Sequence, residues 1–135
     1  MPARRFLFLH PMNGLIPSFP VADINRSVEF YQEVLGFELV RITGKDDVTR
    51  AFLRAGQLRI VFRSVAGESV VDYRKPTLED RIILHIPIDD VRRLYDRIRG
   101  QVPLISDLEP RLFGAYEFTI EDVNGILLTF SELKP

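Results

Sequence analysis

The chain contains an internal repeat, in which a short aliphatic motif with an aspartate is followed by an amphipathic stretch of helical character. Val21–Ile24 begins the first copy, and Ile88–Val91 begins the second. Each copy continues into short segments of alternating polarity, which end with Leu58–Arg63 in the first half and Leu127–Glu132 in the second. A repeat of about half the chain indicates one supersecondary unit used twice, because one unit alone cannot bury its apolar face. We therefore expect two packed modules with a ligand site between them.

Composition restricts the classes of function that fit the chain. The 135 residues suffice for one ordinary domain, and the formal net charge of −1 gives no electrostatic reason to expect nucleic acid or an anionic membrane as a partner. The chain has no cysteine and two histidines, His10 and His85, which excludes disulfides, thiolate metal sites and cysteine nucleophiles. No apolar run is long enough for a membrane span or a signal sequence, so we expect a cytoplasmic protein.

The first half predicts one helix flanked by strands. Asp23 stands at the N-cap position, and apolar residues follow it at helical spacing as far as Gly36, a residue type that commonly ends helices. Four segments are expected to be strands, namely Leu15–Val21, Phe37–Ile42, Val48–Arg54 and Leu58–Arg63.

The second half repeats this order. Asp89 or Asp90 caps the second helix, Gly100 ends it, and the Asn124-Gly125 pair predicts a hairpin turn. The expected strands are Arg81–Ile88, Val102–Ile105, Gly114–Ile120 and Ile126–Glu132. We therefore expect residues 1–135 to form a single domain of two modules, at about 14–64 and 81–133. A loop over 65–80 joins the modules, and residues 1–13 form an N-terminal arm.

One motif in the first half carries a family resemblance. It reads Asp-x-x-x-Ser-x-x-Phe-Tyr-x-x-x-Leu-Gly from Asp23 to Gly36, and the second half has Glu121–Gly125 where the family usually has Asp-Pro-Asp-Gly. Over Leu15 to Glu132 the chain resembles the vicinal oxygen chelate superfamily, which contains glyoxalase I, extradiol dioxygenases, and fosfomycin- and bleomycin-resistance proteins. The resemblance implies an α+β fold, in which two βαβββ modules form a cup-shaped mixed sheet.

The resemblance also implies where a metal ion would bind, because the family's enzymes take ligands from the first and last strand of each module. Counting from the motif gives the four positions Ile16, Ile60, Ile83 and Thr129. Three aliphatic side chains and one threonine cannot hold a divalent cation, and a shift by one residue brings no ligand into place. We therefore predict no metal and no other cofactor. A site made of His85 with Glu117 or Glu132 stays open as an alternative.

Alternation along the key strands predicts which side chains line the cup. This alternation makes candidate ligand-binding residues of Ser18, Ile60, Phe62, His85 and Thr129. Phe113 and Tyr116 are further candidates because they flank a loop that could close over the cup, and Glu117 is a candidate whose facing the pattern leaves open. His85 is also the candidate catalytic acid or base, since its side chain titrates near neutral pH. In this register Arg59 and Arg63 point away from the cup. A shifted register would bring both into the cup and would favour an anionic ligand.

These features support three hypotheses of function. The leading one is a metal-free relative of the bleomycin-resistance group that binds a small, partly apolar molecule in its cup. The second is a metal-independent, or atypical metal-dependent, lyase, isomerase or dioxygenase-like enzyme that uses His85. The third is a regulatory or scaffold dimer with a filled cup. The resemblance implies a homodimer, in which the apolar segment Phe6–Leu9 is a candidate contact.

Overall fold

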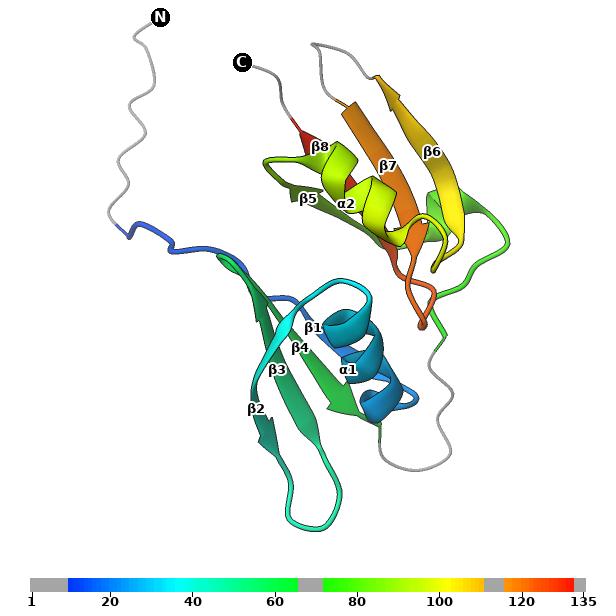
Figure 1. Cartoon of the computed structure of the whole chain (residues 1–135). Helices are drawn as coiled ribbons and strands as arrows, with labels where there is room; N and C mark the ends of the chain where they lie inside the picture. The colour runs from blue at the N-terminus through cyan, green and yellow to red at the C-terminus, as the bar shows by residue number, and fades with distance from the viewer. Residues whose placement is uncertain (1–9, 66–71, 111–115, 133–135) are drawn as a thin grey trace, which may run out of the picture.

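The computed structural model describes residues 10–65, 72–110 and 116–132, which form two modules of the same topology (Figure 1). The elements of the first module are β1 (Ser18–Val21), α1 (Ile24–Glu33), β2 (Glu38–Thr43), β3 (Arg50–Ala55) and β4 (Leu58–Ser64). A short 3-10 turn, η1 (Leu78–Asp80), precedes the second module. The elements of the second module are β5 (Ile83–Pro87), α2 (Val91–Ile98), β6 (Leu104–Pro110), β7 (Tyr116–Glu121) and β8 (Leu127–Glu132).

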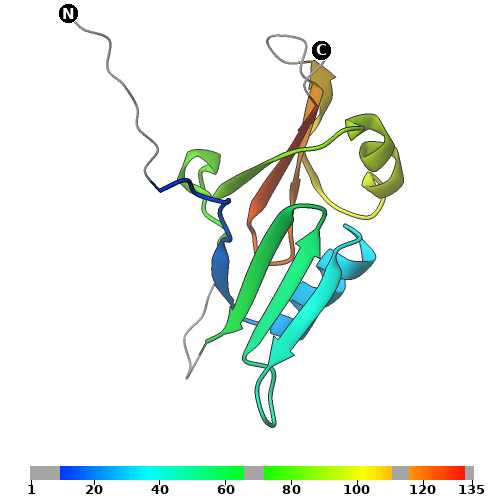
Figure 2. The same cartoon turned by 90° about the vertical axis from the view of Figure 1, so that its left-hand side faces the viewer.

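Each module contributes a four-stranded mixed sheet. The strand orders are β1-β4-β3-β2 and β5-β8-β7-β6, with the first strand of each module parallel to the last and the other pairs antiparallel. The predicted pair of βαβββ modules is therefore confirmed. Among the described residues, the strands of each sheet pair only with strands of the same sheet. Figure 2 views the first sheet from the face opposite α1, and the helix lies behind the sheet.

The helix boundaries follow from the predicted caps. The Asp23 carboxylate accepts the Arg26 N–H at 3.1 Å, and the Asp90 carboxylate accepts the Arg93 N–H at 3.1 Å, so Asp90 rather than Asp89 caps α2. Gly36 has a φ of +75°, as expected of a residue that ends a helix. Within the described parts of the chain, neither helix has the length or the apolar character of a membrane-spanning helix.

The prediction that Ile60 and Phe62 line the cup face is wrong. Both belong to the core on the α1 side of the first sheet, where they are 2% and 0% exposed, and the Phe62 ring lies 4.9 Å from that of Tyr31. The error comes from the turns used for counting. Ala55 pairs with Leu58 across a turn of two residues, whereas five residues separate Glu121 from its partner Leu127. The two turns therefore differ by an odd number of residues. Because side chains alternate along a strand, an odd shift in the count places every side chain on the opposite face.

A buried polar cluster joins the two modules. The Tyr31 hydroxyl donates to Asp122 Oδ2 at 2.6 Å, and the Asn124 amide donates to the Ser27 hydroxyl at 3.0 Å. Asp122 Oδ1 accepts the N–H groups of Asn124 and Ile126 at 2.8 and 2.9 Å. These bonds attach α1 to the turn between β7 and β8, so they fix the first module against the second.

Candidate functional site

His85 lies on the face of the second sheet that points away from α2. It pairs with Thr129 across the parallel β5–β8 ladder, and Thr129 shares a 2.8 Å hydrogen bond with Thr119 on β7. Phe118 and Phe130, the neighbours of these threonines, belong to the core on the other face, where Phe118 contacts the Tyr95 ring of α2. Thr129 is 4% exposed and His85 is exposed. The imidazole is thus accessible beside a buried pair of hydroxyl groups.

The accessible His85 borders a hollow between the two modules, which we call the inter-module hollow. Its volume is about 680 Å³. The lining residues from the first module lie just after α1 and in the β3–β4 hairpin: Leu35, Phe37, Ala55, Gly56, Gln57 and Leu58. Those from the second module are His85, Ile86, Pro87, Ile88, Asp89, Leu94 and Phe130. The wall is mostly apolar, and the residues with polar side chains along it are Gln57, His85 and Asp89.

The other predicted site residues are distributed over several surfaces. Glu117 shares the face of Thr129, because it lies two residues before Thr119 on β7. Tyr116 points to the opposite face, where it borders a small hollow with Val91 of α2. Ser18 is exposed at the edge of the first sheet, and Phe113 lies outside the described residues. The structure therefore groups His85, Thr129 and Glu117 and leaves Ser18 and Tyr116 apart from them.

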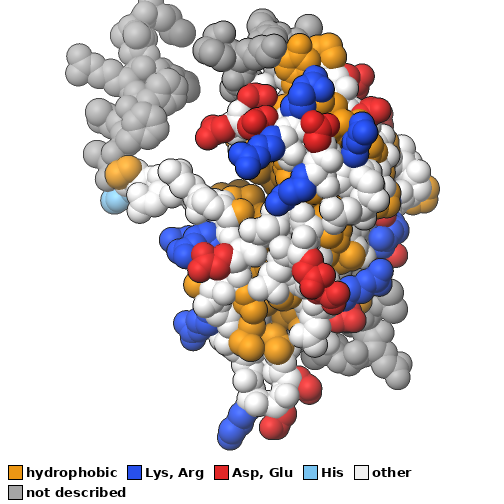
Figure 3. Space-filling model, viewed as in Figure 1, with side chains coloured by type: hydrophobic (Ala, Val, Ile, Leu, Met, Phe, Trp, Pro, Cys, Tyr) orange, Lys and Arg blue, Asp and Glu red, His pale blue; other side chains and the backbone are white. Residues whose placement is uncertain are grey.

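The face of the first sheet opposite α1, here called the open face, is rich in arginine. Its basic side chains are Arg41, Arg50, Arg54, Arg59 and Arg63. Figure 2 turns this face to the viewer, and Figure 3 shows Lys and Arg side chains along the left edge of the lower module. The sequence predicted this position for Arg59 and Arg63 only in the shifted register. The alternation of Arg50, Phe52 and Arg54 with core residues is the signal that could have located the face.

The strand register also tests whether a metal ion fits the positions that the family uses. The Val61 N–H bonds to the carbonyl oxygen of Pro17, as the Leu127 N–H bonds to that of Ile82. Arg63 therefore occupies in the first sheet the position that Thr129 occupies in the second. A guanidinium has no acceptor and stays charged, so it does not fit a cation site. Among the described residues, no three or more His, Cys, Asp or Glu side chains form a group that could hold a metal ion.

The chain is similar to known proteins both in sequence and in fold. The sequence model of the Glyoxalase/Bleomycin resistance protein/Dioxygenase superfamily matches residues 9–130. A search of curated proteins gave no significant match.

Solved structures with a similar fold include TioX from Micromonospora sp. ML1, with 19% identity, a TM-score of 0.68, and coverage of 90% of this chain and 100% of TioX. The protein VPC_CASS1 from the mobile metagenome of V. Pseudocholerae has 21% identity, a TM-score of 0.69, and coverage of 95% and 100%. A lactoylglutathione lyase from Agrobacterium tumefaciens has 19% identity, a TM-score of 0.67, and coverage of 91% and 96%. At these identities the similarity shows the fold alone.

Proposed function

Because the chain belongs to the glyoxalase/bleomycin resistance protein/dioxygenase superfamily, we propose that it binds a small, partly apolar molecule without using a bound metal ion. The inter-module hollow is the observation that supports this function. Its volume of about 680 Å³ lies within the range of small-molecule sites, and its mostly apolar wall carries a few polar groups, as such sites do.

The wall of the hollow suggests how a ligand is held. Phe37, Leu58 and Phe130 offer apolar surface, and burying apolar ligand surface against it contributes about 25 cal/mol per Å². The imidazole of His85 and the amide of Gln57 can each donate and accept a hydrogen bond, which would orient a polar group of the ligand. Sequestration of a ligand needs no more than these contacts.

Thermal unfolding of the full chain with a panel of planar aromatic antibiotics and aromatic metabolites tests this function. A compound that binds the native state at 100 times its Kd adds about 2.7 kcal/mol to the free energy of unfolding, so it raises the Tm measurably. We expect at least one such compound. His85→Trp, which adds bulk at the wall of the hollow, should reduce or abolish the shift, whereas His85→Gln should retain most of it. A compound whose shift is unchanged by His85→Trp would place the ligand elsewhere.

The second candidate function is a lyase, isomerase or dioxygenase-like enzyme that uses His85 as an acid or base. Its supporting observation is the exposed imidazole at the edge of a ligand-sized hollow. Within the described residues, however, no hydrogen bond orients the His85 ring, as a third group normally does at a catalytic histidine. Mass spectrometry of the incubated mixture would show whether a bound compound is converted. If His85→Gln stops the conversion without weakening binding, the result would favour the enzyme.

We also propose that two copies of the chain associate. The edge strand β2 exposes two aliphatic side chains, Val40 at 52% and Ile42 at 53%. Exposed apolar edge strands are surfaces on which proteins commonly associate. Light scattering after size exclusion should give the mass of a dimer, and the double substitution Val40→Lys and Ile42→Lys should give a monomer with unchanged circular dichroism. A monomeric parent chain would contradict the proposal.

A further inference from the structure

We propose that the open face of the first sheet is a binding site for a small organic anion, meaning a molecule with an oxyanion group and an apolar or aromatic body. This site is separate from the inter-module hollow. The two lie on opposite sides of the β3–β4 turn, and both include Gly56 and Gln57 in their linings.

The first argument is the pairing of like charges across the sheet. Arg54 lies directly opposite Arg59, and Arg50 lies directly opposite Arg63, in the antiparallel β3–β4 ladder. Directly opposed side chains are about 4.5–5.5 Å apart at their Cβ atoms, and like charges at this separation destabilise a sheet. Glu38 offsets part of this cost at Arg54, and a bound anion would offset more of it.

The second argument is the shortage of carboxylates on this face. Glu38 accepts a hydrogen bond from Arg54 Nη2 at 2.8 Å, at the outer edge of the sheet. Among the described residues, no carboxylate lies within ion-pairing distance of Arg50, Arg59 or Arg63. The whole chain has a net charge of −1, so the excess positive charge is local to this face. Three guanidinium groups therefore remain available to a ligand.

The third argument is the apolar centre between the two arginine pairs. Phe52 and Val61 are opposite one another in the ladder, between the pairs, and the Arg41 guanidinium lies 5.8 Å from the centre of the Phe52 ring. A flat ligand body can lie on Phe52 and Val61 while its oxyanion contacts one arginine pair. The two pairs are four residues apart along β3, about 13 Å, so a small ligand reaches one pair and not both.

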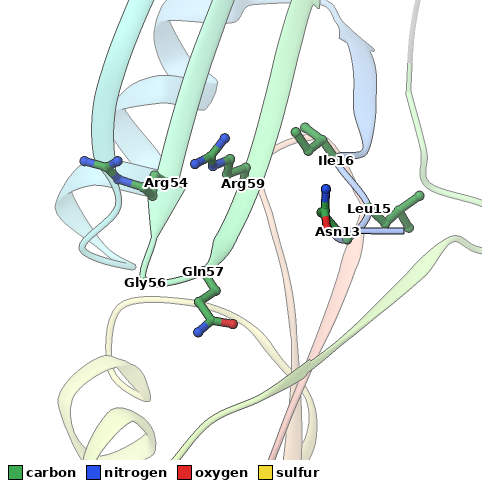
Figure 4. Close-up of a pocket in the computed structure, with 8 residues that line it drawn as sticks. Asn13, Leu15, Ile16, Arg54, Gly56, Gln57 and Arg59 are labelled. Atoms are coloured by element: carbon green, nitrogen blue, oxygen red, sulfur yellow. The ribbon is translucent and has the colours of Figure 1, made fainter. Parts of the chain in front are cut away.

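We place the ligand at the Arg54–Arg59 pair, where Arg54 also bonds to Glu38 and Arg59 has no carboxylate partner among the described residues. The pair borders a hollow of about 600 Å³, whose other lining residues include Asn13, Leu15 and Ile16. In Figure 4 the two guanidinium groups project from the same face of β3 and β4, and Gln57 points away from them. Guanidinium groups bind carboxylates and phosphates with paired hydrogen bonds, so oxyanions of both kinds suit this pair.

Phenyl phosphate is the probe that tests this site, with phenol as its neutral counterpart, in calorimetric titrations of the full chain. We expect phenyl phosphate to bind and phenol to bind at least several-fold more weakly. Arg59→Gln should weaken phenyl phosphate binding by about tenfold or more, because hydrogen bonds between charged groups are among the strongest. Arg26→Gln, an equal change of charge on the exposed side of α1, should leave the Kd within twofold.

Several results would overturn the proposal. Equal weakening by Arg59→Gln and Arg26→Gln would reveal a general effect of net charge, and equal binding of phenol and phenyl phosphate would exclude anion recognition. A short oligothymidylate that binds much more tightly than phenyl phosphate would assign the face to single-stranded nucleic acid. His85→Trp narrows the inter-module hollow and should leave phenyl phosphate binding unchanged, so this site can fail or succeed independently of the proposed function.

Discussion

Phe62→Ala is expected to lower the free energy of unfolding by about 3–5 kcal/mol, the usual cost of truncating a buried phenylalanine. Phe62 is fully buried in the core of the first module, against the Tyr31 ring of α1. Removing the ring leaves a cavity that the surrounding sheet and helix cannot close completely. Equilibrium denaturation in urea, monitored by circular dichroism, measures the loss.

Phe52→Ala is the matched control, since it makes the same change on the open face of the same sheet. Phe52 is half-buried and contacts Arg41, so we expect less than half of the loss caused by Phe62→Ala. If Phe62 lined a ligand site instead, its substitution would weaken ligand binding and leave stability nearly unchanged. Equal losses at the two positions would contradict the assignment of faces.

Tyr31→Phe is expected to lower the free energy of unfolding by about 1–3 kcal/mol, because it leaves a buried oxygen of Asp122 without its hydrogen bond. Tyr31 and Asp122 belong to the polar cluster that holds the first module against the second. Tyr95→Phe on α2 is the matched control. The Tyr95 hydroxyl donates to the exposed Asp107, whose oxygen can bond to water instead, so the control should lose less.

The loss caused by Tyr31→Phe should depend on pH. Burial raises the pKa of Asp122 from its ordinary value of 3.8, while the Tyr31 hydroxyl and three backbone N–H groups act to lower it. A carboxyl with a raised folded-state pKa stabilises the fold below the unfolded pKa, and this contribution is lost as the pH rises through the folded value. Removing the Tyr31 hydroxyl raises that folded pKa further, so the ionised carboxylate at neutral pH becomes more costly.

Denaturation of both proteins at about pH 4 and about pH 7 checks this expectation. The loss caused by Tyr31→Phe should be larger at the higher pH. Asp122→Asn gives an independent control, because its amide can still accept the two backbone N–H groups and donate to Tyr31 without carrying a charge. Its stability relative to the parent chain should improve as the pH rises, and a loss that is independent of pH would contradict the role given to Asp122.

The fold was predictable from the sequence because its signals are local. The repeated aspartate before each amphipathic stretch indicated both helix N-termini, and Gly36 marked the end of the first helix. The facing of β5 and β8 was also predicted correctly, so that His85 and Thr129 share the face away from α2. These features depend on residues close together in the chain, and alternation within one strand reports them directly.

The orientation of the β4 side chains, toward α1 or toward the open face, was not predictable in the same way. It depends on the number of residues in the β3–β4 turn, and Gly56 and Gly125 look alike in sequence although their turns differ in length. That difference sends Ile60 and Phe62 into the core and brings Arg59 and Arg63 onto the open face. The arginine pairs that support an anion site therefore follow from pairing between strands.

The sequence by itself determined the two βαβββ modules and the helix caps, since each rests on residue type and local spacing. The tertiary structure alone decided that the two sheets stay separate, that a hollow beside His85 opens between the modules, and that Arg54 lies opposite Arg59. The physical reason is that such neighbours are set by strand register and by contacts such as Tyr31 with Asp122, which join segments far apart in the chain.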